Sequence, residues 1–147
     1  MVANVGLGQG DNDTISVVDL RADPARVVNT VTVPQTPEGL KLSPDGTLCA
    51  VVTMNGSNKP PGSPFLSDHG LLVLFQIDGT TLTKVGEAPI GHWSQGVAFS
   101  ADSKTILVTN MVEQNVQVLS WDGSTLRDTG QRIAVSGGPA AIRTTGN

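Results

Sequence analysis

A repeated segment is the feature that most constrains the fold of this chain. One copy, from Glu38, reads EGLKLSPDGTLCAVVT, and a second, from Gln95, reads QGVAFSADSKTILVTN. Glycine, serine, aspartate and valine recur in register at 39/96, 43/100, 45/102 and 51/108. The segment PAAIRT, from Pro139 to Thr144, begins the same unit a third time. Repeats of this length predict an array of small units, each too small to bury its apolar face alone.

The composition favours many short strands. Of the 147 residues, 38% are hydrophobic, and 17 Gly and 9 Pro supply turns. No stretch repeats apolar residues at helical spacing over three turns. The net charge of -4 argues against a nucleic-acid partner, which needs a basic surface, and no apolar run approaches the roughly 18 residues that would span a membrane. The first residues predict no signal peptide, so the compartment stays undetermined.

Each unit predicts four strands. The middle unit has a Ser-Pro-Asp-Gly turn after its first strand and an Asp-Gly turn before its fourth, and its strands are expected at 39–42, 48–54, 71–77 and 82–88. The next unit predicts strands at 96–99, 105–110, 115–121 and 126–135. A partial unit before Pro37 predicts strands at 2–4, 14–20 and 27–33. With the last segment, twelve strands run three times in the order second, third, fourth, first.

The predicted fold is all-β, with blades of four antiparallel strands stacked face to face. Leu71 to Phe75 is almost continuously apolar, which is typical of a strand buried on both faces. The chain then forms a single domain of about three blade-equivalents. Its parts are a partial blade at 1–36, a blade at 37–90 that carries a long insertion at 55–70, a further blade at 91–136, and a closing strand at 137–147.

The repeat resembles a known family. The Ser-Pro-Asp-Gly turn, the Val-rich strand that ends in Thr-Asn and the segment TISVVDL resemble YVTN-type β-propeller repeats. The turns in QIDGTTL and SWDGSTL are similar to those of lactonase-like propellers related to 6-phosphogluconolactonase. The resemblance covers nearly the whole chain and implies a propeller, generally of seven blades. It does not specify an activity, because this scaffold hosts many. Related bacterial propellers are often exported, which leaves a periplasmic or secreted parent protein open.

Three blade-equivalents are too few to close a ring, because propellers use four to eight blades. In one interpretation the chain is the C-terminal part of a larger propeller, and the missing blades complete the ring. In the other it is a homo-oligomer through its exposed blade edges, and two copies give six blades. The two are compatible, and we expect the chain not to be a stable monomer.

Candidate site residues lie in the loops that join fourth to first strands and second to third strands, because these loops open on one face near the central channel. The candidates for ligand binding are Glu38, Asp68, His69, His92, Trp93, Gln95 and Asn110. His92 is the candidate catalytic residue, since an imidazole can act as a general base near neutral pH. In the alternative, Trp93 packs at a blade junction and both histidines are surface loop residues. Asp68 and His69 are too few for a catalytic metal site, so no metal or cofactor is expected.

Other conspicuous residues are given structural roles. Asp45 and Asp102 are expected to cap their own turns, and Cys49 to be a buried thiol. The Pro-, Gly- and Ser-rich insertion lacks strand patterning, and its Phe65-Leu66 pair is expected to dock on a neighbouring blade or to contact a partner.

Two functions remain open. The first is a binding or scaffold module that presents loops to a partner or a small ligand. The second is a hydrolase of sugar lactones, in which a loop histidine or carboxylate activates water. Because lactonase chemistry would draw residues from blades all round the channel, the isolated chain is expected to be a binding module rather than an enzyme.

Overall fold

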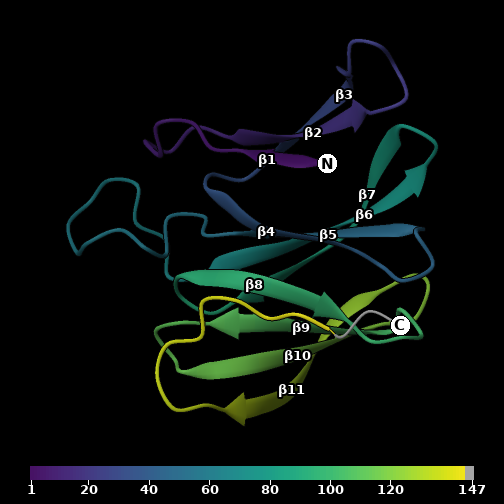
Figure 1. The fold of residues 1–147 in the computed structure, drawn as a ribbon. Helices are drawn as coiled ribbons and strands as arrows, with labels where there is room; N and C mark the ends of the chain where they lie inside the picture. The colour runs from purple at the N-terminus through teal and green to yellow at the C-terminus, as the bar shows by residue number, and fades with distance from the viewer. Residues whose placement is uncertain (145–147) are drawn as a thin grey trace.

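Three antiparallel sheets make up residues 1–144, which the computed structural model describes. The first sheet contains β1 (Val2–Asn4), β2 (Asp13–Asp19) and β3 (Arg26–Val33). The second contains β4 (Pro37–Leu42), β5 (Leu48–Thr53), β6 (Gly70–Asp78) and β7 (Thr81–Ile90). The third contains β8 (Ser94–Phe99), β9 (Thr105–Asn110), β10 (Asn115–Trp121) and β11 (Leu126–Ala134). The sheets stack face to face like propeller blades (Figure 1), so the predicted all-β, partial-propeller fold is confirmed.

The prediction of twelve strands was wrong by one. The described part of the chain has eleven strands, and Pro139–Thr144 runs without a strand ladder. The remainder of the predicted closing strand, residues 145–147, lies outside the described residues. A strand needs a hydrogen-bonding neighbour, and no described segment pairs with residues 139–144. These residues therefore have the sequence of a first strand without its sheet.

The repeat extends to the irregularities of the strand pairing. The pairing of the first strand with the second is interrupted near the start of both β4 and β8. The pairing of the third strand with the fourth shifts at equivalent places in all three sheets, beside Val17, Leu74 and Gln117. The turn positions also match, since Gly46 and Ser103 both have a positive φ. The three units therefore share a backbone path as well as a sequence pattern.

Two apolar layers hold the three sheets together, and β5 supplies both. The alternation of side chains along a strand sends Ala50 and Val52 toward the third sheet and Cys49 and Val51 toward the first. All six residues of β5 are buried. Burial raises the pKa of the Cys49 thiol to about 12, as expected for an inert structural cysteine. The centre of the middle sheet, formed by β5 and residues 72–75 of β6, is thus buried on both faces, as the apolar run from Leu71 to Phe75 predicted.

The repeated aspartates cap their turns, as predicted. Asp45 accepts hydrogen bonds from the Ser43 hydroxyl at 2.6 Å and from the backbone and hydroxyl of Thr47, which hold its pKa at about 2. Asp102 accepts equivalent bonds from Ser100 and the Lys104 backbone. Within residues 1–144, no helix is long and apolar enough to cross a membrane.

Candidate functional site

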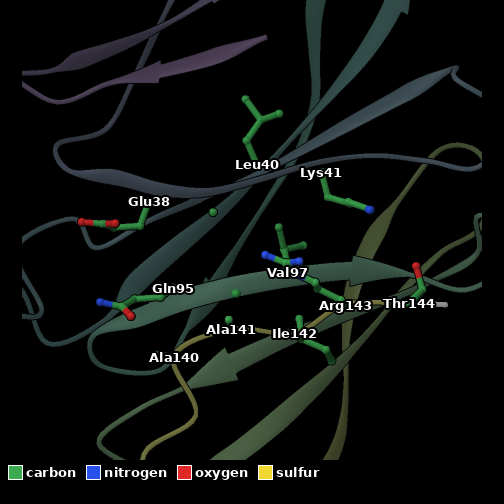
Figure 2. A pocket seen from close by; sticks show the side chains of 12 residues that line it. Glu38, Leu40, Lys41, Gln95, Val97, Ala140, Ala141, Ile142, Arg143 and Thr144 are labelled. Atoms are coloured by element: carbon green, nitrogen blue, oxygen red, sulfur yellow. The ribbon is translucent and has the colours of Figure 1, made fainter. Parts of the chain in front are cut away.

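A groove on the inner side of the stack runs between β4, β8 and the segment 140–144. Its volume is about 610 Å³, and Figure 2 shows the side chains that line it. β4 and β8 are the edge strands of their sheets, so one side of each is free of strand pairing. The lining residues are Glu38, Gly39, Leu40, Lys41, Gln95, Gly96, Val97, Ala140, Ala141, Ile142, Arg143 and Thr144.

Glycine allows the inner strands to pack closely. A Cβ atom at Gly39 would lie 2.1 Å from the carbonyl oxygen of Gln95. A Cβ atom at Gly96 would lie 2.9 Å from the Ile142 nitrogen and 3.0 Å from the Ala141 Cα. The repeated glycine therefore brings each inner strand against the backbone of the next segment, and this approach shapes the groove.

The groove has a polar lining. In Figure 2, Glu38 and Gln95 lie to the left and the Lys41 amino group points to the right, while the Arg143 side chain reaches the middle of the groove beside Val97. Neither Lys41 nor Arg143 forms an ion pair with a carboxylate of the described residues. Each cationic group can therefore bind an anionic group, and the carboxylate and the amide can bind hydroxyl groups.

A second groove, of about 320 Å³, opens between the second and third sheets near their outer strands β7 and β11. It is lined by Asp68, Pro89, Ile90, Gly91, His92, Asn110, Glu113, Asn115, Gln117, Asp128 and Arg132. We call it the inter-blade groove. It contains the candidate base His92, whereas none of the residues of the inner groove is a histidine.

His92 is oriented by Glu113. Its Nδ1 lies 2.6 Å from Glu113 Oε1, and its backbone N–H donates to both carboxylate oxygens, at 3.0 and 3.1 Å. Partial burial opposes ionisation of Glu113, but the hydrogen bonds from His92 outweigh it, and the pKa of this carboxyl lies below its usual range. An ionised carboxylate can only accept, so Nδ1 carries the proton. In the neutral ring Nε2 is then free to accept a proton.

A buried hydrogen-bond network forms the floor of the inter-blade groove. Gln117 is 2% exposed; its amide nitrogen donates to the Pro89 carbonyl and to Asp128, and its oxygen accepts from Asn110. Arg132 binds Asp128 through two nitrogens, at 2.6 and 2.8 Å. Together with the bond from Gln117, this pair holds the pKa of Asp128 below its usual range. The network ties the third sheet to the end of β7 and fixes the groove shape.

The 55–70 insertion packs on the loop between β1 and β2 of the first unit, as predicted for Phe65, while its neighbour Leu66 remains exposed. A Cβ atom at Gly10, in the loop between β1 and β2, would lie 2.6 Å from the Phe65 ring. The Phe65 carbonyl accepts from Gln35, which in turn accepts from the Gly10 backbone. The insertion thus bridges the loops of two adjacent units.

The same insertion positions Trp93 and the second histidine. The hydroxyl of buried Ser57 accepts from the Trp93 backbone at 3.0 Å, and Trp93 has a positive φ of 50° with a 43% exposed side chain. His69 Nδ1 lies 2.5 Å from Asp68 Oδ1. Asp68 borders the inter-blade groove, while His69 is not among the residues that line it. Within residues 1–144, no three His, Cys, Asp or Glu side chains gather closely enough to hold a metal ion.

The structure divides the predicted site residues between two grooves. Glu38 and Gln95 line the inner groove, and Asp68, His92 and Asn110 line the inter-blade groove. Sequence reasoning missed the charged partners Lys41, Arg143, Glu113, Asp128 and Arg132. Lys41 and Arg143 occupy the same position of the repeat, and each follows an apolar residue. This correspondence is a sequence signal that could have identified both cations. Nothing local indicates that Glu113 meets His92, because the contact depends on how two loops fold.

Comparison with solved structures identifies similar folds. No protein-family model and no curated protein sequence matches the chain. A candidate 6-phosphogluconolactonase from Bacteroides fragilis is similar over 94% of this chain and 39% of its own, with 18% identity and a TM-score of 0.71. The periplasmic gluconolactonase PpgL of Pseudomonas aeruginosa matches over 89% and 37%, with 20% identity and a TM-score of 0.65. Hydrazine synthase of Kuenenia stuttgartiensis matches over 95% and 47%, with 15% identity and a TM-score of 0.63.

These likenesses show a propeller-like fold shared with lactonases, at identities that establish the fold alone. The chain spans less than half the length of each of these three structures.

Proposed function

We propose that the chain is a ligand-binding module of a YVTN-type, lactonase-like propeller, and that its inner groove binds a small polyhydroxylated anion of the sugar-acid class. The observation that carries this proposal is the groove between β4, β8 and residues 140–144, whose lining includes the cationic side chains of Lys41 and Arg143 and the hydrogen-bonding groups of Glu38 and Gln95. A carboxylate or phosphate fits Lys41 or Arg143, and sugar hydroxyls fit Glu38 and Gln95. Two of the similar solved structures carry the names of sugar-lactone hydrolases.

Titration with gluconate and 6-phosphogluconate, followed by NMR or calorimetry, tests this proposal. We expect saturable binding, and a loss of affinity of about tenfold in Arg143→Ala, because a charge-assisted hydrogen bond contributes on the order of 1.5–3 kcal/mol. Lys104→Ala is the matched control, because it removes an exposed cation from the turn between β8 and β9. Absence of binding, or an equal loss in the control variant, would contradict the proposal.

A second candidate function, hydrolysis of sugar lactones, is favoured by the His92–Glu113 pair. In this reaction water attacks the lactone carbonyl and gives a proton to His92 Nε2. The C–O bond of the ring then breaks, and the ring oxygen receives the proton. Glu113 holds the imidazole in the tautomer that this step needs and stabilises the imidazolium that forms.

Hydrolysis of δ-gluconolactone, measured above the spontaneous rate at constant pH, tests this second function. General-base catalysis contributes about 10²–10⁴-fold, so His92→Ala should remove most of the enzymatic rate. Glu113→Gln should remove less, because it keeps the groove filled. His69→Ala is the matched control, since His69 also pairs with a carboxylate but does not line the groove. A rate equal to the spontaneous one, or one insensitive to His92→Ala, would rule this function out.

A further inference from the structure

The first sheet has an open edge at a defined position of the repeat. β1 pairs with β2 and with no other described strand, whereas its equivalents β5 and β9 also pair with the inner strands β4 and β8. The register supports this equivalence, since Asn4 lies opposite Thr14 as Asn110 lies opposite Asn115. The place beside β1 therefore corresponds to the place of an inner strand.

Residues 139–144 have the sequence and the packing of that inner strand. Ala141 aligns with Gly39 and Gly96 in the repeat. The backbone of Ala141 and Ile142 lies over Gly96 as the backbone of Gln95 lies over Gly39. Figure 2 shows this segment beside β8 in the inner groove. The segment thus stands to β8 as β8 stands to β4, but no described strand pairs with it.

Asn4 supplies a second sign that an inner strand belongs beside β1. Its amide nitrogen donates to Thr14 and Ser16, just as that of Asn110 donates to Asn115 and Gln117. The Asn110 oxygen also accepts from Gly91 and Ser94, and so anchors the chain that enters β8. No described residue donates to the equivalent oxygen of Asn4. In the repeat, Ser136 aligns with Gly91, so its backbone N–H corresponds to the N–H that Gly91 donates to Asn110.

We propose that a second copy of this chain completes the first sheet. Residues 139–144 of one copy add antiparallel to the free edge of β1 in the other copy. In the complete sheets, Leu40 lies opposite Val51 and Val97 lies opposite Val108. The repeat aligns Ile142 with the first residue of each pair and Val2 with the second, so Ile142 of one copy lies opposite Val2 of the other. The Ser136 N–H of the added chain then donates to Asn4.

The geometry of the stack points to a second copy as the occupant. In Figure 1 the first sheet lies at the top of the stack, whereas the 139–144 segment runs beside β8 of the third sheet, and β4 and β5 of the second sheet lie between the two. The segment therefore does not reach β1 of its own copy. It can keep its contact with β8, because β8 itself packs on Gly39 and pairs with β9 at the same time.

This addition is reciprocal. A two-fold axis lets each copy donate its segment to the other, so that six units close into a ring, a number within the range of known propellers. The new strand also covers Val2, which is 49% exposed in the single copy. The pairing does not depend on the proposed ligand or on the proposed hydrolysis.

Two measurements on the 147-residue chain test the proposal. Light scattering and sedimentation at micromolar concentrations should give about twice the single-chain mass of 15.2 kDa. A synthetic peptide with the sequence of residues 136–144 should compete for the β1 edge and shift the mass toward that of one chain, while a scrambled peptide should not. A folded chain that stays at 15.2 kDa up to about 100 μM overturns the proposal.

The second measurement tests the register. Opposite residues of paired strands lie within disulfide reach, with Cα atoms about 4.5–5.5 Å apart. The double variant Val2→Cys/Ile142→Cys should therefore form a covalent dimer under mild oxidation. Val28→Cys/Ile142→Cys is the matched control, because Val28 is exposed on β3, on the far edge of the same sheet. Buried Cys49 stays unreactive in both. A dimer without this cross-link, or with equal cross-linking in the control, overturns the proposed pairing.

Discussion

The molecule contains two versions of the same junction. At the first, β4 packs against β8; at the second, β8 packs against residues 139–144. Both are built on a repeated glycine whose Cα faces the backbone of the next segment. They differ in what lies behind them, because β4 and β8 belong to four-stranded sheets with an apolar layer between, whereas residues 139–144 have no described sheet.

Close packing of inner strands does not by itself make a blade. At the first junction Leu72, Leu74, Ile106 and Leu119 are fully buried between two sheets. At the second, Ile142 is partly buried and Arg143 is exposed. The backbone contact is common to both junctions, but the hydrophobic stabilisation belongs to the first alone.

The largest expected effect comes from truncation of the apolar layer. Leu72→Ala should lower the free energy of unfolding by about 2–5 kcal/mol, because a cavity forms in a region with no solvent access. Ile142→Ala should lower it by less than about 1 kcal/mol, because its side chain is only partly buried. Urea unfolding of both variants provides the measurement. Equal losses would show that the two junctions are equally structured.

Gly39→Ala tests the first junction directly. The added Cβ would lie 2.1 Å from a backbone carbonyl that cannot rotate away, so the sheets must shift. Overpacking of this kind costs about 1–3 kcal/mol, and we expect the upper end. Gly79→Ala is the control, because nothing lies within 4 Å of its Cβ and only its positive φ is strained. A smaller loss at Gly39 than at Gly79 would contradict the packing described for β4 and β8.

Gly96→Ala tests the second junction and should cost less. The added Cβ would meet the Thr109 hydroxyl at 2.8 Å and the Ile142 nitrogen at 2.9 Å. Residues 139–144 can move away without opening an apolar layer, so we expect a loss of about 1 kcal/mol. Trypsin cleavage after Arg143 should become faster in this variant. In Gly39→Ala, the molecules that remain folded should be cleaved at the same rate as the unchanged protein.

Acid should weaken the contact between the second and third sheets, where two carboxyls have lowered pKa values. Hydrogen bonds from His92 outweigh partial burial at Glu113, and Arg132 is the main cause at Asp128. A carboxyl whose pKa is lower in the folded state stabilises the fold above its unfolded pKa, about 4.3 for Glu and 3.9 for Asp. This stabilisation is lost as the pH falls through the folded-state values.

Urea unfolding at a series of pH values between 7 and 2 measures this dependence. Glu113→Gln/Asp128→Asn should flatten it below about pH 4.5, the region in which carboxyls titrate. An unchanged pH profile in the double variant would contradict the role given to these carboxyls.

Much of the fold could be predicted because the repeat carries local information. The almost continuous apolar run from Leu71 to Phe75 predicted a strand buried on both faces, and residues 72–75 of β6 are all buried. The Ser-Pro-Asp-Gly turn predicted that Asp45 caps its own backbone, which the structure confirms. The pattern of residues 139–144 predicted a strand that the structure lacks, since a strand depends on its neighbour as well as on its own sequence.

The candidate site could be predicted only in part. The loop position of His92 follows from the order of strands, whereas Gln95, expected in the same loop, lies on β8, and the two residues line different grooves. The partnership of His92 with Glu113 joins residues from two loops, and sequence spacing carries no sign of it.

The strand order, the turns, the repeated glycines and the apolar runs follow from the local sequence, because each depends on neighbouring residues or on a fixed period. The stacking of the sheets sets which loops meet and how the polar residues divide between the two grooves, and it leaves one edge of β1 and residues 139–144 without a described strand partner. The physical reason is that hydrogen-bond pairing and charge pairing act between segments far apart in the chain, so they are settled only when the sheets stack.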